Sequence, residues 1–548
     1  ASNGVVIITT KRGSKRGIEV SFDPVISIQS QPKMHDVLNA EQWVTLVNER
    51  APIDGIETLP EWSNPSALHS IDWQDELYRT GLKQIYNIGL RGGGDKVQSA
   101  FSAGYFDQEG IVLGSQFKRL NASLNLDYTP FTWLRSSSSL KYTRRNYETH
   151  IGTGGQIGDS EDKGILDLSF NPPTMTGNKF TDQVKDGKGN YGFYTPTHFF
   201  LKEYGNPVYD AETDDIKNEN NVFLGTTSLE FTIWDGLKFK TNFGISTNET
   251  SGYFFKPSDT RSLDQYGDPG IQRAQNTYSQ YANNSFEWLW ENTISYTKTF
   301  GNHSIDVVAG VSAQENSYRQ MGVKGFGSVS DVLRDVGSTQ DITDLTGNQQ
   351  TFSLASQFGR INYKFMDKYL ITGTVRRDGS SKFAPDNQYG VFPSGSIAWR
   401  IKQESFLQEA NAIYDLKIRA SYGEVGNQEG INLFQYLAQY STGGSQISFG
   451  NYGYPFSRSY QPGLQLAALP NPDLKWETSK MTDIGLDIAF LNGALTFTVD
   501  WYRKESKDFL LNLPVPPQTG FTTVARNVGS IRNSGLEFAV GYRSSTSK

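Results

Sequence analysis

The amino-acid sequence predicts an all-β protein, specifically a transmembrane antiparallel β-barrel. Three observations lead to this fold class. Apolar and polar residues alternate along many segments, short turns and long loops alternate between those segments, and no apolar run approaches the roughly 18 residues that a membrane helix requires. A soluble chain of 548 residues would divide into several domains of about 150 residues, but no linker or compositional break is present.

Composition excludes several other classes of protein. The net charge of −7 at pH 7 indicates no nucleic-acid partner. The chain has no cysteine, which excludes disulfide scaffolds, thiolate metal sites and cysteine nucleophiles. A mean hydropathy of −0.50 argues against a helical membrane protein but not against a barrel, because alternating strands average to a hydrophilic value.

The alternation is clearest in residues 120–128, 237–246, 414–422, 484–490 and 495–501. Each of these segments reads as a strand with one apolar and one polar face. In total we expect about 16 strands, the first at residues 18–29 and the last at 532–542. The apolar face, which includes Leu124, Leu126, Leu486 and Ile488, is expected to contact lipid, and the polar face to line the lumen.

Short turns are expected at residues 91–96, 129–132, 234–236, 300–303, 366–367 and 491–493. Several contain the Asp-Gly or Asn-Gly steps that favour tight hairpins. Long connections are expected at residues 30–83, 148–220, 248–283, 315–350, 424–476 and 506–531. This one-sided distribution is typical of outer-membrane barrels, whose short turns are periplasmic and whose long loops are extracellular, and is not typical of a soluble sandwich.

One helix is predicted, at residues 39–50 within the first long loop. Asn39 is a suitable cap because Gln42 follows three residues later, and Trp43, Leu46 and Val47 would form an apolar stripe. The helix either packs on the rim of its own barrel or docks a partner. In the second case Gln42, Trp43 and Leu46 are the candidate docking residues.

Aromatic residues gather in two of the long loops. Flat rings beside amide and carboxylate groups suit a sugar or peptide site, but the same rings would also pack loops together or lie at a membrane interface. The candidate ligand-contact residues are Tyr191, Tyr194, Phe199, Tyr436, Tyr440, Tyr452, Tyr454 and Tyr460.

No pattern in the sequence indicates an enzyme. The glycine-rich runs at 90–96 and 152–158 do not match a phosphate-binding or dinucleotide fingerprint. The five histidines have no metal-ligand spacing, and no Gly-x-Ser-x-Gly motif is present. We therefore expect no catalytic site, no cofactor and no metal site.

Several segments resemble the SusC/RagA-type TonB-dependent outer-membrane transporters. The similar segments follow the family's order along the chain: residues 3–13 (NGVVIITTKRG), 71–75 (IDWQD), 104–111 (GYFDQEGI), 377–383 (RDGSSKF), 390–394 (GVFPS), 416–423 (LKIRASYG) with 426–428 (GNQ), and 471–477 (NPDLKWE). In this family a plug domain fills a barrel of about 22 strands. The resemblance implies that residues 1–16 are the end of the plug and residues 17–548 an incomplete barrel, so that the chain is an internal piece.

The resemblance also implies a function and partners. The expected function is TonB-dependent import of a nutrient across the Gram-negative outer membrane, with an oligosaccharide as first candidate cargo and a peptide as second. The expected partners are a SusD-like surface lipoprotein and, through a segment absent here, the TonB complex. A structural or adhesive barrel without transport is the alternative, and a secreted carbohydrate hydrolase is weaker because no carboxylate pair stands out.

Overall fold

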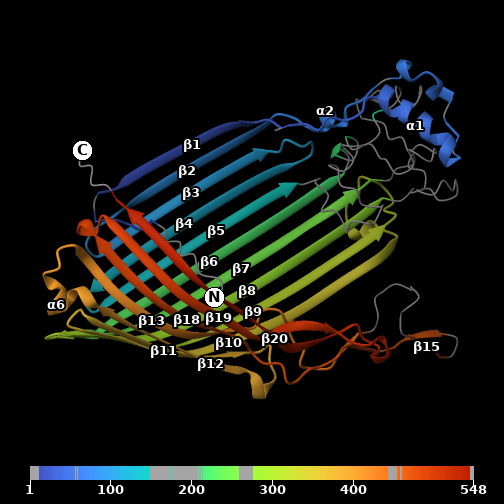
Figure 1. Cartoon of the computed structure of the whole chain (residues 1–548). Coiled ribbons are helices and arrows are strands. Elements are labelled where there is room, and N and C mark those ends of the chain that lie inside the picture. The colour runs from blue at the N-terminus through green and yellow to red at the C-terminus, as the bar shows by residue number, and fades with distance from the viewer. Residues whose placement is uncertain are drawn as a thin grey trace.

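The computed structural model is organised around one antiparallel sheet of 16 strands that curls round on itself (Figure 1). The structure describes residues 11–148, 214–257, 276–441 and 465–543, except residues 16, 32, 56, 59 and 69. It also describes residues 173, 208, 211–212, 453–456 and 459–463. Within these residues, no helix is both long and apolar enough to cross a bilayer.

The strands pair in the order in which they occur along the chain, and β1 and β20 form the two edges of the sheet. The strands are β1 (Glu19–Gln29), β2 (Gly81–Gly93), β3 (Val97–Glu109), β4 (Gln116–Phe131), β5 (Leu134–Glu148), β6 (Asp215–Trp234), β7 (Leu237–Lys256), β8 (Thr277–Phe300), β9 (His303–Phe326), β10 (Asp341–Phe365), β11 (Tyr369–Ser380), β12 (Tyr389–Arg400), β13 (Ile413–Asn427), β18 (Glu477–Phe490), β19 (Leu495–Pro514) and β20 (Thr523–Tyr542).

Between β13 and β18 the chain forms two small two-stranded sheets outside the main one. They pair β14 (Gln439–Ser441) with β17 (Gln465–Ala468), and β15 (Gly453–Phe456) with β16 (Ser459–Pro462). The principal helices are α1 (Ala40–Asp54), α2 (Trp73–Leu77) and α6 (Ser405–Gln408). The predicted all-β barrel architecture, with 16 strands in one antiparallel sheet, is confirmed.

The two faces of the sheet differ as the alternation predicts. On β4, Leu124 and Leu126 are 39% and 38% exposed, whereas the intervening Asn125 and Asp127 are 4% and 7% exposed. Segment 11–15 lies against this polar face, since Arg12 forms a salt bridge with Asp127 at 2.8 Å. The polar face therefore lines the interior of the curled sheet, and the apolar face forms its outer wall.

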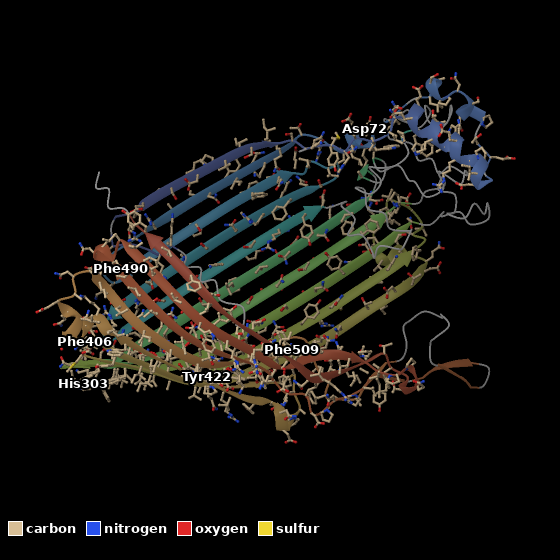
Figure 2. All side chains as sticks on the ribbon, in the orientation of Figure 1. Asp72, His303, Phe406, Tyr422, Phe490 and Phe509 are labelled. Atoms are coloured by element: carbon tan, nitrogen blue, oxygen red, sulfur yellow. The ribbon has the colours of Figure 1, made fainter. Side chains whose placement is uncertain are left out.

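Aromatic rings form a belt near the short-turn end of the outer wall. Figure 2 shows His303, Phe406 and Phe490 at this end and Asp72 at the opposite end. Neighbouring rings lie with centroids 4.8 to 6.4 Å apart in two series, Phe131, Trp133, Phe231 and Phe239, and Phe300, His303, Phe365, Tyr369 and Trp399. Such rings are typical of the boundary between hydrocarbon and water.

One carboxylate ties part of this belt to the connection that follows β12. Glu404 accepts hydrogen bonds from Tyr369 Oη at 2.7 Å, from Trp399 Nε1 at 3.1 Å and from Lys368 Nζ at 2.9 Å. These donors, with the Lys368 contact first among them, lower the pKa of Glu404 from 4.5 to about 2. The ionised carboxylate therefore orients two rings of the belt.

Several strands are longer than the sequence predicts. Residues 506–531 were expected to form a long loop, but β19 and β20 remain paired as far as Pro514 and Thr523. The predicted loop 315–350 is likewise shortened by the ends of β9 and β10. Outside the lipid the two faces of a strand need not differ in polarity, so the alternation disappears while the backbone hydrogen bonds continue.

Buried side chains gather at the long-loop end rather than in the wall. One cluster contains Phe383, Ile431, Leu474, Leu510 and Ala525, with the partly buried Trp476 packed against it. Hydrogen bonds connect the same segments: Trp476 Nε1 donates to the Gln388 carbonyl at 2.8 Å, and Asn471 Nδ2 to the Ala525 carbonyl at 2.8 Å. The cluster joins the β11–β12 and β13–β18 connections to the long-loop ends of β19 and β20, which are far apart in sequence.

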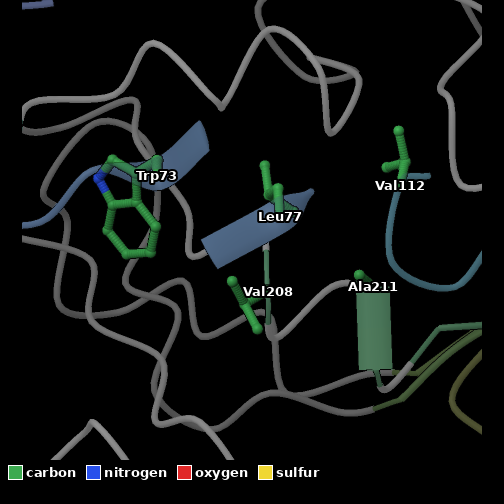
Figure 3. Packing of buried hydrophobic residues seen from close by; sticks show 5 residues of the cluster. All are labelled: Trp73, Leu77, Val112, Val208 and Ala211. Carbon is green, nitrogen blue, oxygen red and sulfur yellow. The ribbon is translucent and has the colours of Figure 1, made fainter. Parts of the chain in front are cut away.

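A second buried cluster lies over the start of the sheet. Trp73 and Leu77 of α2 pack with Val112 from the β3–β4 turn and with Val208 and Ala211 (Figure 3). Asp72 caps α2 by accepting a hydrogen bond from the Gln74 amide at 2.9 Å. Trp73 and Asp72 belong to the 71–75 motif, and Val112 follows the 104–111 motif directly.

Replacing Glu404, the carboxylate that orients two rings of the belt, should change how the thermal stability of the protein depends on pH. Because the pKa of Glu404 is depressed, its contribution to folding is present above about pH 4.5 and is lost as the pH falls towards about 2. We expect Glu404→Gln to unfold at a lower temperature than the wild type at pH 7, and the difference to close below pH 4.5. Thermal unfolding followed by tryptophan fluorescence measures this, and a difference that stays constant down to pH 2 would contradict it.

Truncating the centre of the long-loop cluster should loosen it. Phe383 is fully buried, and removing such a ring costs about 3–5 kcal/mol. We expect Phe383→Ala to accelerate limited proteolysis in the segment between β13 and β18 without changing the β-sheet circular dichroism. Phe406→Ala is the control, because Phe406 is 70% exposed at the short-turn end. Equal cleavage of the two variants would show that the cluster does not hold the loops together.

Candidate functional site

The residues predicted to contact ligand are only partly described by the structure. Tyr191, Tyr194, Phe199 and Tyr452 lie outside the described residues. Tyr454 and Tyr460 are on the paired strands β15 and β16, of which the backbone alone is described. Tyr440 is on β14 and is 66% exposed, and Tyr436 precedes it as a half-buried side chain. Among the described residues, these aromatic side chains are not brought together into one site.

The predicted helix is present as α1, and its cap has the expected form. The Asn39 side chain accepts from the Gln42 amide, and the Gln42 side chain accepts from the Asn39 amide. The predicted apolar stripe is wrong in one residue, because Leu46 is 54% exposed. The buried residues of α1 are Ala40, Val44, Val47 and Ala51.

Some apolar side chains of α1 pack against the protein, and others are exposed to solvent. Trp43 packs edge-on against the buried Trp62, with ring centroids 5.7 Å apart. Leu46 and Ile53 are seven residues apart on the exposed side of α1, where Ile53 is 83% exposed. In Figure 1, α1 stands beyond the long-loop end of the sheet. Of the candidate docking residues, Gln42 and Leu46 are therefore on the surface, and Trp43 is mainly structural.

Sequence reasoning missed a cluster of amide and hydroxyl groups on the lumen face of β6 to β8. Asn220 is at its centre and is 7% exposed. Its Nδ2 donates to Asn248 Oδ1 at 2.6 Å and to Thr250 Oγ1 at 2.8 Å. On the next strand Tyr281 donates to Asn218 Oδ1 at 2.6 Å. The run Asn-Glu-Asn-Asn at 218–221 is the only sequence signal that marked this place.

This amide cluster keeps hydrogen-bonding groups free for a ligand. Asn248 is exposed, and its Nδ2 has no partner among the described residues. Arg145 Nη1 donates to Asn220 Oδ1 at 3.4 Å and places a cation beside the amides. The cluster therefore offers donors and acceptors held in place by one another, which suits a neutral polar ligand.

Charged groups on the lumen face are largely paired. Arg419 on β13 contacts Asp483 at 2.9 Å, Asp487 at 3.3 Å and Asp500 at 2.5 Å. Across the described lumen wall, a further polar cavity of about 180 Å³ is lined by Arg12, Arg135, Ser137, Ser228, Glu230 and Lys240. The wall thus presents mixed charge with no strong excess of one sign.

The described residues contain no group of three or more histidine, aspartate or glutamate side chains that could hold a metal ion. The chemistry that the arrangement supports is binding, through hydrogen bonds in the lumen and through packed loops at its mouth.

Comparisons with known proteins agree with this geometry. Residues 159–547 match the family model described as TonB dependent receptor-like, beta-barrel. The TonB-dependent receptor P26 of Formosa agariphila is 31% identical over 550 residues, covering 98% of this chain and 51% of the relative. The TonB-dependent receptor SusC of Bacteroides thetaiotaomicron is 28% identical over 574 residues, covering 99% of this chain and 52% of the relative. This chain therefore spans about half the length of these relatives.

Solved structures share the fold. The structure of the RagAB peptide transporter superposes with a TM-score of 0.79 at 21% sequence identity, covering 100% of this chain and 61% of that chain. The family match covers well over half of the chain and includes the strands from β6 to β20 of the curled sheet. The chain therefore belongs to the TonB-dependent receptor β-barrel family, which consists of receptors and transporters of the Gram-negative outer membrane.

Proposed function

We propose that this chain is the barrel portion of a transporter that imports a nutrient across the outer membrane in a TonB-dependent cycle, with an oligosaccharide as the first candidate cargo. The observation that carries the proposal is the amide and hydroxyl cluster around Asn220 on the lumen face. Sugar hydroxyls both donate and accept hydrogen bonds, and this cluster offers both kinds of partner.

A peptide is the second candidate cargo. Its backbone amides would bond to the same side chains, and the fold is shared with a peptide transporter. The mixed and paired charges of the lumen, such as Arg419 with its three aspartates, favour a neutral ligand over a strongly charged one.

Residues 1–16 are proposed to be the end of a plug domain, and residues 17–548 the barrel. Support comes from Arg12, which lies against the lumen wall and pairs with the nearly buried Asp127. Arg135 and Ser137 also bond to Asp127, and Asn125 Nδ2 donates to the Lys11 carbonyl at 3.2 Å, so the segment that enters the barrel is held against β4. A tether of this kind would let a plug move while its end stays attached.

A SusD-like lipoprotein is the proposed extracellular partner, and α1 is its proposed docking element. Support comes from the exposed stripe of Leu46 and Ile53 on a helix that is fixed by its own buried face. A structural or adhesive barrel would use the same loops but would have no need of a ligand site in the lumen.

The cargo prediction concerns Asn248. Removing its free amide should weaken binding of a neutral oligosaccharide by about 1 kcal/mol, or roughly fivefold. We expect Asn248→Ala to show this loss in isothermal titration of the detergent-solubilised protein with a size-graded set of neutral oligosaccharides. The control is Asn221→Ala, because Asn221 is on the outer face of the neighbouring strand β6, where it accepts from Tyr142 Oη at 2.9 Å.

The same titration with peptides separates the two candidate cargoes. Loss of peptide binding alone in Asn248→Ala would favour peptide import. No loss with either class of ligand would show that the cluster around Asn220 is structural and would support the alternative of a barrel without transport.

The docking prediction concerns Leu46. Placing a charge in the exposed apolar stripe should weaken the complex by about 1–2 kcal/mol, or roughly 5- to 30-fold. We expect Leu46→Arg to reduce co-purification of a SusD-like lipoprotein encoded beside the receptor. Thr45→Arg adds the same charge about 100° away round α1 and should leave the complex intact. Equal effects of the two variants would argue that α1 does not dock the partner through this stripe.

A further inference from the structure

The outer wall contains a groove of about 700 Å³ across β8 to β11. Its apolar lining includes Ile294, Ala309, Val311, Gly359 and Val375. These residues fall on the same face as the other exposed apolar side chains, for example Val311 and Val375, which are both 50% exposed. The groove therefore opens towards lipid and not towards the lumen.

Small residues create the groove. Ala309 and Gly359 are paired directly across β9 and β10, between the larger Ile294 on β8 and Val375 on β11. A Cβ atom on Gly359 would meet only the Val308 carbonyl oxygen, at 3.9 Å. Among the described residues no side chain fills the depression, which leaves it open to an acyl chain from the membrane.

Arg377 lies at the end of the groove nearest to the long loops. It is eight residues along β11 from Tyr369 in the aromatic belt. At about 3.3 Å per residue and a tilt of about 40°, this separation corresponds to about 20 Å along the membrane normal. The belt marks the periplasmic boundary of the lipid, so Arg377 lies close to the headgroups of the outer leaflet.

No carboxylate of the described part of the chain pairs with Arg377. Its guanidinium lies 3.8 Å from the centre of the Tyr389 ring and donates to Gln357 Oε1 at 3.5 Å, and it has no carboxylate partner among the described residues. Two other cations of the outer face do have such partners: Arg144 pairs with Glu219 at 2.7 Å and Arg503 with Glu505 at 3.9 Å. Arg377 is therefore available to an anion at the membrane surface.

Two amide side chains of the groove, near Arg377, have unused hydrogen-bonding groups among the described residues. Asn292 and Gln357 both line the groove, and Asn292 has no side-chain hydrogen-bond partner among the described residues. An amide that faces hydrocarbon without a partner is costly. A lipid whose acyl chain is joined to its headgroup through ester or amide carbonyls would supply acceptors at this level.

We propose that this groove binds one phosphorylated acyl lipid of the outer leaflet. An acyl chain lies over Ala309 and Gly359, the carbonyl of its linkage accepts from the amide of Asn292 or Gln357, and the phosphate is held by Arg377. The positive charge of Arg377 favours an anionic headgroup over a zwitterionic one. The depression gives one acyl chain more contact with the protein than the rest of the outer wall gives to the surrounding lipid.

Native mass spectrometry of the detergent-solubilised chain tests the proposal with lipid A as the probe. We expect the wild type to retain one lipid A molecule and to retain phosphatidylethanolamine at least fivefold less well. Gly359→Leu, or Ala309→Leu if that variant does not fold, should fill the groove and reduce retention of lipid A about tenfold. Arg377→Gln should reduce it about fivefold, and Arg377→Lys should restore most of it.

Two controls separate this site from general lipid adhesion. Ala122→Leu adds bulk to the outer wall on β4, and Arg503→Gln removes an outer-face charge on β19, so both should retain lipid A as the wild type does. Retention unchanged in Gly359→Leu and Arg377→Gln, or reduced equally in Arg503→Gln, would overturn the proposal. Displacement of lipid A by inorganic phosphate would also overturn it, because the anion alone would then be the ligand.

Discussion

Every backbone N–H and C=O that crosses the hydrocarbon must find its partner within the protein, since lipid offers none and each unsatisfied group costs several kcal/mol. In this chain the strands between β1 and β20 meet the constraint by bonding to neighbours on both sides in sequence order, whereas β1 and β20 are edge strands, each bonded on one side. The order is interrupted in sequence only between β13 and β18, where β14 to β17 form separate small sheets outside the main one. The curled sheet, its two faces and the position of its loops all follow from this pairing.

Because the wall is one layer thick, the protein has little buried core within the membrane, and its packing is concentrated at the two ends. At the short-turn end the aromatic belt is partly oriented by Glu404. At the long-loop end two buried clusters join connections that are distant in sequence. The segments that carry the family resemblance supply residues to both clusters, such as Trp73 and Phe383. In this structure Trp73 and Phe383 pack connections of the long-loop end together.

Because the wall is a single layer, adjacent residues on one strand face two different environments, the lumen and the outer surface. Along β6, Asn220 is nearly buried within a lumen cluster, while the adjacent Asn221 faces outward and accepts from Tyr142. Along β11, Arg376 bonds to Asp378 on the lumen side, while Arg377 on the outer wall contacts the Tyr389 ring and the Gln357 amide. A change of one residue in register would exchange these environments, so the register decides which surface each group serves.

The sequence by itself determined the fold class, the approximate number of strands, the direction in which Leu124 and Leu126 face, and the cap of α1, because these depend on local periodicity and local hydrogen bonds. It did not reveal the extent of β19 and β20 beyond the lipid, where alternation is lost, or the exposure of Leu46, which depends on how α1 packs against Trp62. The cluster around Asn220 and the groove below Arg377 were decided only by the tertiary structure. Each is assembled from residues on neighbouring strands whose register no local pattern specifies.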